Sequence, residues 1–219
     1  MIALIDYGAG NVRSVHKALE TVDASVRVTR DPEAIQAATK IVLPGVGAFG
    51  DCMAGLRRAG LVDALCQAVE HGKLLLGICV GMQVLFEEGE EMGRHAGLGL
   101  LPGRVVRFSF STSSTGEERT LKIPHTGWNQ IEPVRACPLL NGLSRAWTYF
   151  NHAYFCQAQP EHTLAVTDYG DPFPAVVGRD SVYGIQFHPE KSQEVGLKIL
   201  ANFARLVNEE GGGDRFSGN

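Results

Sequence analysis

The sequence has no long apolar run and no strong excess of one charge. No stretch approaches the ~18 consecutive apolar residues that a membrane-spanning helix needs, and the N-terminal segment lacks the basic start of a signal peptide. Twenty Lys and Arg residues stand against 24 Asp and Glu residues, which gives a net charge of −4. Bulk charge therefore gives no reason to expect binding to nucleic acid or to a membrane surface.

Cysteine is also scarce and poorly placed for cross-linking. The five cysteines are an odd number at wide spacings, and no Cys-x-x-Cys pair occurs. This pattern argues against a disulfide framework and a thiolate zinc site, and it favours a reducing, cytoplasmic environment. Because no His-Glu-x-x-His motif occurs either, we expect no metal and no cofactor. Glycine, in contrast, is abundant, with 26 residues.

Short apolar segments alternate with helical patterns in the first half of the chain, where we expect helices over residues 56–69 and 80–88. This order predicts an α/β fold with a mainly parallel central sheet flanked by helices. Strand-like segments separated by turns follow, among them residues 148–155, so we expect additional antiparallel strands. We predict one domain over residues 1–207 and a flexible polar tail over residues 208–219.

Cys79 lies in the pattern Gly77-Ile-Cys-Val-Gly81, between an apolar strand pattern and a helical one. This is the arrangement of a nucleophile elbow, in which glycines prevent collisions between side chains on either side of a sharp turn. Such a turn lifts the nucleophile out at a helix N-terminus, where backbone N–H groups favour a thiolate and hold an oxyanion. The alternative is a small buried residue at a strand end.

His188 and Glu190 follow a strand pattern in the sequence His-Pro-Glu. On an extended chain, residues two apart point the same way, and Pro189 keeps His188 out of helical geometry. A carboxylate that holds one imidazole nitrogen leaves the other free to face a thiol. The pair therefore predicts a base and its orienting acid for Cys79. A zinc-deaminase interpretation of His-x-Glu is disfavoured, because the required Pro-Cys-x-x-Cys is absent.

A further glycine-rich segment, PGVGAF at residues 44–49, ends an expected strand. Ligands bind at the carboxyl ends of strands in α/β sheets, and these glycines would let backbone N–H groups approach a substrate oxygen. The segment is interpreted either as an oxyanion-binding loop or as an ordinary tight turn.

Three segments together resemble the class-I glutamine amidotransferases: GICVGMQ at 77–83, PGVGAF at 44–49 and GIQFHPEKS at 184–192. Three others narrow the resemblance to the glutaminase subunits of imidazole glycerol phosphate synthase in histidine biosynthesis: DYGAGN at 6–11, PHTGWN at 124–129 and YFNHAYF at 149–155. The resemblance spans about residues 1–207.

The resemblance implies a role for each matching residue. Cys79 would attack the side-chain amide of glutamine, His188 would protonate the departing ammonia, and Glu190 would orient the imidazole. The implied oxyanion donors are the backbone N–H of Val80 and a backbone N–H from Val46 or Gly47. The implied contacts to the amino-acid end of glutamine are Gln83, Ala153 and Tyr154.

The resemblance also implies a partner. Free ammonia protonates readily in water, so a glutaminase delivers it along a closed path, here in a heterodimer with a (β/α)₈-barrel cyclase. That cyclase would form imidazole glycerol phosphate and an aminoimidazole carboxamide ribonucleotide. We expect Tyr7, Asn11 and Trp128 at the interface. Two alternatives stay open: a glutaminase subunit for another acceptor, such as chorismate or a purine intermediate, and a catalytically silent regulatory module.

Overall fold

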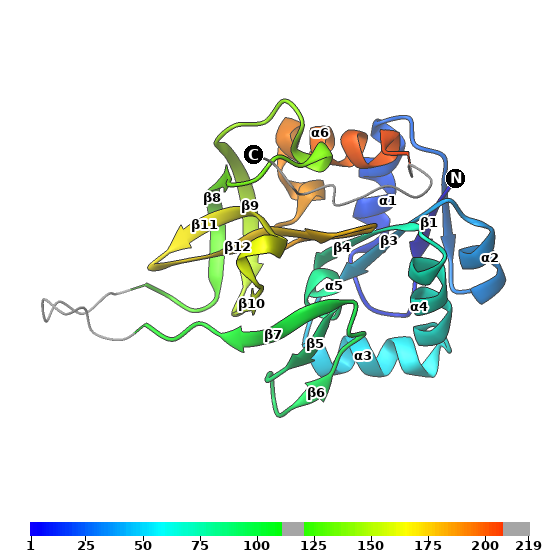
Figure 1. The fold of residues 1–219 in the computed structure, drawn as a ribbon, viewed down its shortest axis with the longest axis horizontal. Coiled ribbons are helices and arrows are strands. Elements are labelled where there is room, and N and C mark those ends of the chain that lie inside the picture. The colour runs from blue at the N-terminus through cyan, green and yellow to red at the C-terminus, as the bar shows by residue number, and fades with distance from the viewer. Residues whose placement is uncertain (111–120, 208–219) are drawn as a thin grey trace, which may run out of the picture.

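The computed structural model describes residues 1–110 and 121–207, so the tail predicted at 208–219 lies outside the described residues. A nine-stranded sheet forms its centre, in the order β2-β1-β3-β4-β13-β12-β11-β8-β9 (Figure 1). The first five strands in this order are parallel: β2 (Val26–Thr29), β1 (Ile2–Ile5), β3 (Lys40–Gly45), β4 (Leu74–Cys79) and β13 (Val182–Ile185). Strands β1, β4 and β13 are buried along their whole length, as expected for a parallel sheet that is covered on both faces.

The other four strands of this sheet pair in antiparallel fashion: β12 (Asp171–Arg179), β11 (Thr163–Tyr169), β8 (His125–Pro133) and β9 (Ala146–His152). The expected mainly parallel sheet with additional antiparallel strands is therefore confirmed.

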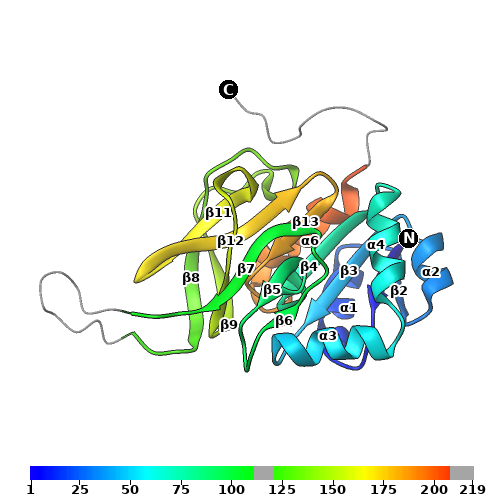
Figure 2. The same cartoon turned by 60° about the horizontal axis from the view of Figure 1, so that its bottom comes forward.

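Helices cover both faces of the parallel strands (Figure 2). One face carries α1 (Val12–Thr21) and α6 (Gln193–Arg205), which also contact each other. The opposite face carries α3 (Phe49–Arg58) and α4 (Val62–Glu70), and the short helix α2 (Pro32–Ala37) packs against α4. The side chain of Asp31 caps α2 by accepting a hydrogen bond from the backbone N–H of Glu33 at 3.0 Å.

Two helix predictions were wrong in extent. The helix expected over 56–69 is interrupted between α3 and α4, where Gly60 adopts a φ of 67° that favours glycine. The helix expected over 80–88 ends after one turn as α5 (Val80–Gln83), and the chain then continues as strand β5 (Phe86–Gly89).

Among the described helices, none is long and apolar enough to cross a membrane.

A second sheet of four strands, which the sequence did not predict, packs beside the first in the order β10-β7-β5-β6. Besides β5 it contains β6 (His95–Ala96), β7 (Leu101–Arg107) and β10 (Tyr154–Gln157). The single strand expected over 148–155 is in fact two strands, because β9 ends at His152 and β10 begins at Tyr154. Three short 3₁₀ helices complete the described fold: η1 (Pro138–Leu140), η2 (Pro160–His162) and η3 (Pro189–Lys191).

Candidate active site

The site lies where three neighbouring parallel strands reach their carboxyl ends. Gly45, at the end of β3, is in register with Cys79, at the end of β4, and β13 runs beside β4 and leads to His188. A cavity of about 450 Å³ opens at this edge. Its lining contains eight of the twelve residues singled out from the sequence: Asn11, Val46, Gly47, Cys79, Val80, Gln83, Tyr154 and His188.

Cys79 occupies a strained elbow between β4 and α5. Its φ of 55° and ψ of −114° place a non-glycine residue in a sparsely populated region. A Cβ at Gly81 would lie 1.9 Å from the carbonyl oxygen of Leu43, and one at Gly77 would lie 2.5 Å from the carbonyl oxygen of Gly81. The need for glycine at both positions is thus confirmed, but only Gly77 avoids a collision across the turn, whereas Gly81 avoids one with the neighbouring strand β3. Cys79 is only 3% exposed, and it lines the cavity. Its thiol is therefore reached from the cavity and not from the outer surface.

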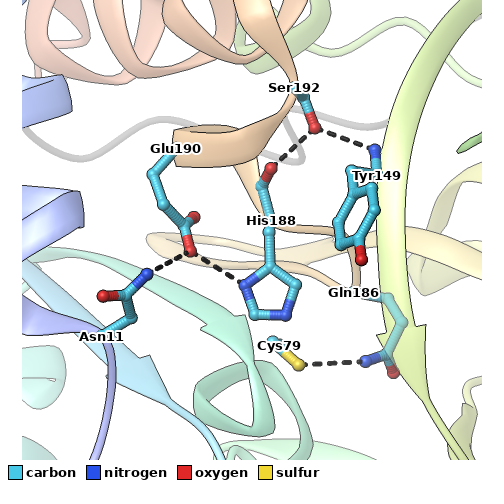
Figure 3. A network of polar contacts seen from close by, with 7 residues as sticks. All are labelled: Asn11, Cys79, Tyr149, Gln186, His188, Glu190 and Ser192. Carbon is cyan, nitrogen blue, oxygen red and sulfur yellow. Dashed lines mark hydrogen bonds and ion pairs between the residues drawn. The ribbon is translucent and has the colours of Figure 1, made fainter. Parts of the chain in front are cut away.

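His188 and Glu190 are in direct contact, as predicted: Nδ1 of His188 lies 2.9 Å from Oε1 of Glu190 (Figure 3). The second ring nitrogen of His188 faces the thiol of Cys79 (Figure 3). The local reason given for the contact was wrong, because Glu190 lies in the 3₁₀ helix η3 and not on an extended chain. The tight turn after Pro189 folds the carboxylate back onto the ring.

Strand β9 and Ser192 hold the backbone of His188 in place. The N–H of His188 donates to the carbonyl of Tyr149 at 2.9 Å. The hydroxyl of Ser192 donates to the carbonyl of His188 at 2.6 Å and accepts from the N–H of Tyr149 at 3.0 Å (Figure 3). The imidazole is therefore fixed at both its backbone and its ring before any ligand binds.

The buried pair Cys79 and Glu190 sets the charge of His188. Burial alone would lower the pKa of His188, but hydrogen bonds and opposite charges from Cys79 and Glu190 raise it to about 10. Burial likewise would raise the pKa of Glu190, but the bonds from His188 and Asn11 hold it below its ordinary value. The arrangement favours a charged imidazolium that is held by the Glu190 carboxylate and faces the thiol of Cys79, which suits a nucleophilic cysteine.

Asn11, expected at a partner interface, also contacts the triad candidate Glu190, and its place at the interface stays a prediction. It stands at the N-cap position of α1, yet within the described structure its side chain makes no capping bond. Its amide instead donates to Oε1 of Glu190 at 3.3 Å (Figure 3). Asn11 therefore orients the carboxylate that orients His188.

Tyr7 and Trp128, the other two residues expected at an interface, differ in exposure. Tyr7 is 7% exposed, and its hydroxyl donates to the carbonyl of Pro44 at 3.0 Å. The Tyr7 side chain is therefore buried against the end of β3, and docking at this residue stays a prediction. Trp128 is 44% exposed and packs edge-on against Tyr149, so docking through Trp128 stays a prediction.

The loop after β3 carries Val46 and Gly47 into the cavity wall, facing the start of α5 at Val80. Gly47 has a φ of 90°, which glycine adopts without strain. The carbonyl of Val46 accepts a weak hydrogen bond from the thiol of Cys52 at 3.5 Å. This places the three implied oxyanion residues beside Cys79, and their role as donors stays a prediction.

The residues expected to contact substrate are only partly in place. Gln83 and Tyr154 line the cavity, whereas Ala153 does not, and its carbonyl accepts from the N–H of Phe108 at 3.1 Å. Both amide hydrogens of Gln83 are engaged, by the carbonyl of Tyr154 at 2.9 Å and by Oε1 of Gln186 at 3.2 Å. Gln83 therefore offers a ligand only its side-chain oxygen.

Sequence reasoning missed two polar residues at the site. Gln186 is fully buried, and its amide donates to Sγ of Cys79 at 3.9 Å. It belongs to the GIQFHPEKS segment two residues before His188, a signal that could have been read. Glu91 lines the cavity and accepts from the N–H of Phe49 at 2.8 Å, and it follows strand β5, where a helix was expected.

Substituting Glu190 with glutamine should lower the pKa of His188 from about 10, because the negative charge beside Nδ1 is lost. A raised pKa means that the charged ring stabilises the folded state fully below pH 6.5 and loses this contribution as the pH rises through about 10. In Glu190→Gln that loss should come at lower pH. Urea unfolding between pH 6 and pH 10 measures it.

The matched control for this substitution is Glu194→Gln, an exposed carboxylate in the first turn of α6. It should leave the pH profile unchanged. Identical pH profiles for Glu190→Gln and the unmodified chain would contradict the assigned contact.

Comparisons with known proteins agree with this geometry. Residues 3–207 match the family model "Glutamine amidotransferase class-I". The chain is 51% identical to "Imidazole glycerol phosphate synthase subunit HisH" of Desulfitobacterium hafniense (strain DSM 10664 / DCB-2), over 96% of each chain. It is 46% identical to the protein of the same name from Bacillus subtilis (strain 168), over 96% of this chain and 98% of that one.

Two solved structures share the fold at low identity. A crystal structure of a glutamine amidotransferase superposes with a TM-score of 0.71 and 22% identity, over 94% of this chain and 100% of that one. PurLQS from Thermotoga maritima superposes with a TM-score of 0.68 and 21% identity, over 92% of this chain and 96% of that one.

Proposed function

The chain belongs to the class-I glutamine amidotransferase family, and within it to the HisH subunits of imidazole glycerol phosphate synthase, and we propose that Cys79, His188 and Glu190 are its glutaminase triad. The observation that carries this proposal is the order of thiol, imidazole and carboxylate: Cys79 and His188 line one cavity, and Glu190 holds the far nitrogen of the His188 ring at 2.9 Å. The reaction releases glutamate and passes ammonia to a cyclase subunit.

In the first half of the reaction, the thiolate of Cys79 attacks the carbonyl carbon of the glutamine side chain. A carbon–sulfur bond forms and the carbonyl π electrons move to oxygen, where N–H groups of Val80 and of Val46 or Gly47 bind the charge. When the intermediate collapses, the carbon–nitrogen bond breaks and the His188 imidazolium gives its proton to the leaving nitrogen. Ammonia leaves, and a thioester stays on Cys79.

In the second half, water attacks the thioester. His188, now neutral, takes a proton from the water as the carbon–oxygen bond forms. Collapse of this intermediate breaks the carbon–sulfur bond, releases glutamate and restores the thiolate–imidazolium pair. Glu190 stabilises the imidazolium at both stages, and Asn11 keeps that carboxylate aimed at Nδ1.

The cavity lining suits an amino acid. Glu91 supplies a carboxylate for the α-ammonium group, and Gln83 supplies its free side-chain oxygen. We expect backbone groups of Tyr154, which lines the cavity, and of its neighbour Ala153 to contact the α-carboxylate. Recognition at both ends would place the side-chain amide against Cys79.

An exposed aromatic patch next to the cavity suits a protein partner. Trp128 on β8 is in register with Tyr149 on β9, and Trp147 lies two residues along β9, so the three side chains share one face of the sheet. Trp128 and Trp147 are 44% and 54% exposed. Lys191 lies over the ring of Tyr149 and also lines the cavity, which joins patch and site. We propose that the barrel cyclase docks here, because large aromatic residues are typical anchors of interfaces.

All five cysteines lie in the described part of the chain and are free. Free thiols agree with the proposed cytoplasmic location.

The proposal is tested by assaying glutamate release from this chain alone, with the cyclase, and with cyclase plus its ribonucleotide acceptor. We expect low turnover alone and at least a ~10-fold increase in the full mixture, with ammonia incorporated into imidazole glycerol phosphate. Stimulation by a chorismate- or purine-type synthase instead of the cyclase would support the alternative acceptor. Binding of the cyclase without any glutamate release would support the silent regulatory module.

Trp128→Ala should weaken cyclase binding by about 2 kcal/mol or more, because an aromatic anchor of the interface is lost.

A further inference from the structure

Two buried histidines that the mechanism does not use meet beside the cavity. His125, from the PHTGWN segment, begins β8, and His152, from the YFNHAYF segment, ends β9. The two residues are in register, and Nδ1 of His125 lies 3.1 Å from Nε2 of His152. They are 3% and 6% exposed, and His152 lines the cavity.

The surroundings of this pair are aromatic. The ring of His125 stacks between Tyr169 and Phe150, with centroid distances of 4.0 and 4.8 Å. Phe108 and Phe173 pack against both imidazoles. Burial lowers the pKa of His125 to about 4 and that of His152 to about 3, so both rings are neutral near pH 7. A neutral imidazole has one donor nitrogen and one acceptor nitrogen.

The partners of the two rings determine which nitrogen carries each proton. Nδ1 of His152 lies 2.8 Å from the carbonyl oxygen of Tyr154, which only accepts, so Nδ1 is the donor and Nε2 the acceptor. His125 must therefore donate from Nδ1 to His152. Its Nε2 then accepts from the amide of Asn129 at 3.3 Å, and that amide also donates to the carbonyl of Asp168 at 2.8 Å.

The chain of hydrogen bonds ends on a carbonyl that is held from two sides. Besides His152, Gln83 on α5 donates to the carbonyl of Tyr154 at 2.9 Å. The two lone pairs of this oxygen are thus both used. Through Gln83 and Gln186 the same network reaches the sulfur of Cys79.

We propose that His125 and His152 are positioning residues that hold the Tyr154 peptide, and with it the wall of the glutamine site, in its binding conformation. The rings act as a fixed relay of hydrogen bonds in which each Nδ1 donates, running from Asn129 on β8 to Tyr154 on β10. The effect on glutamine binding rests on the proposed function, whereas the direction of the hydrogen bonds does not.

The first test is the tautomer of each ring in the unmodified full-length chain. Nitrogen chemical shifts of ¹⁵N-labelled histidine at pH 7 should show both rings with the proton on Nδ1, the less common form. A proton on Nε2 of His152, or a charged ring at this pH, would overturn the proposal. This measurement needs no turnover, so it separates failure of the relay from failure of the proposed glutaminase.

The second test is a matched pair of substitutions assayed in the complex with the cyclase. His152→Asn keeps an N–H donor at the position of Nδ1, whereas His152→Gln places its amide at the position of Nε2 and loses the donor to Tyr154. We expect KM for glutamine to rise about tenfold in His152→Gln, the factor expected for one lost hydrogen bond, with kcat within about threefold. In His152→Asn, KM should stay within about threefold of the unmodified enzyme. Equal KM values in both variants would overturn the proposal.

Discussion

Replacing Cys79 with alanine should lower glutamine hydrolysis at least ~10⁴-fold, because removal of the nucleophile leaves only binding and oxyanion stabilisation. The variant should still fold, because alanine differs from cysteine only by the loss of the sulfur atom, and this sulfur lies at a cavity wall. Glutamate release in the presence of the cyclase and its acceptor measures the loss, and circular dichroism measures the fold.

The same variant should also change His188. The bond and charge of Cys79 contribute to raising the pKa of His188 to about 10, so that pKa should fall in Cys79→Ala. Cys66→Ala is the control, because Cys66 is a free, partly buried cysteine on α4 away from the cavity, and it should retain full activity. Substantial turnover by Cys79→Ala would disprove the proposed mechanism.

Substituting Gly81 with alanine should destabilise the chain by at least ~3 kcal/mol or prevent folding, since overpacking against rigid backbone is among the costliest substitutions. A Cβ at this position would lie 1.9 Å from the carbonyl oxygen of Leu43 and 2.9 Å from its carbon. Both atoms belong to strand β3, which is paired on both sides, so neither is free to move away. The midpoint of urea unfolding measures the effect.

Gly60→Ala is the matched control for Gly81→Ala. Gly60 has a φ of 67°, and a Cβ there would meet no atom within 4 Å. Its cost should be limited to the left-handed conformation, about 1–2 kcal/mol. If the two variants were equally stable, the close approach of α5 to β3 would not be the reason for glycine at position 81.

The sequence indicated the elbow correctly because its chemistry is local. The strand, the turn and the flanking glycines lie within a few residues of Cys79, and the steric conflict that they avoid involves mainly this turn and the adjacent strand. The alternation of strands and helices likewise indicated the parallel half of the sheet. The contact of His188 with Glu190 could also be predicted, although the turn that produces it could not.

The wrong secondary-structure predictions concern segments whose conformation is decided by contacts with distant parts of the chain. Residues 84–88 carry a pattern compatible with a helix, yet Phe86 pairs with Leu101 and the segment becomes a strand of the second sheet. The strand pattern of residues 148–155 shows no break at Ala153. The segment is divided because β9 pairs with β8 in the first sheet and β10 pairs with β7 in the second. Gln186 contacts Cys79 across 107 residues of sequence, and His152 contacts His125 across 27. Local spacing does not give these two contacts, although the place of Gln186 two residues before His188 marked it as a site candidate.

The start of α1 shows what the protein gives up for turnover. Asn11 is among the best residues for capping a helix, and a side-chain cap typically contributes about 1 kcal/mol. The amide nitrogen of Asn11 donates to Glu190, and its side-chain oxygen makes no capping bond within the described structure, so the first turn of α1 lacks that contribution. Selection for stability alone would favour a capping serine or aspartate here. A thermostabilisation campaign guided only by melting temperature would therefore tend to replace Asn11 and remove its hydrogen bond to Glu190.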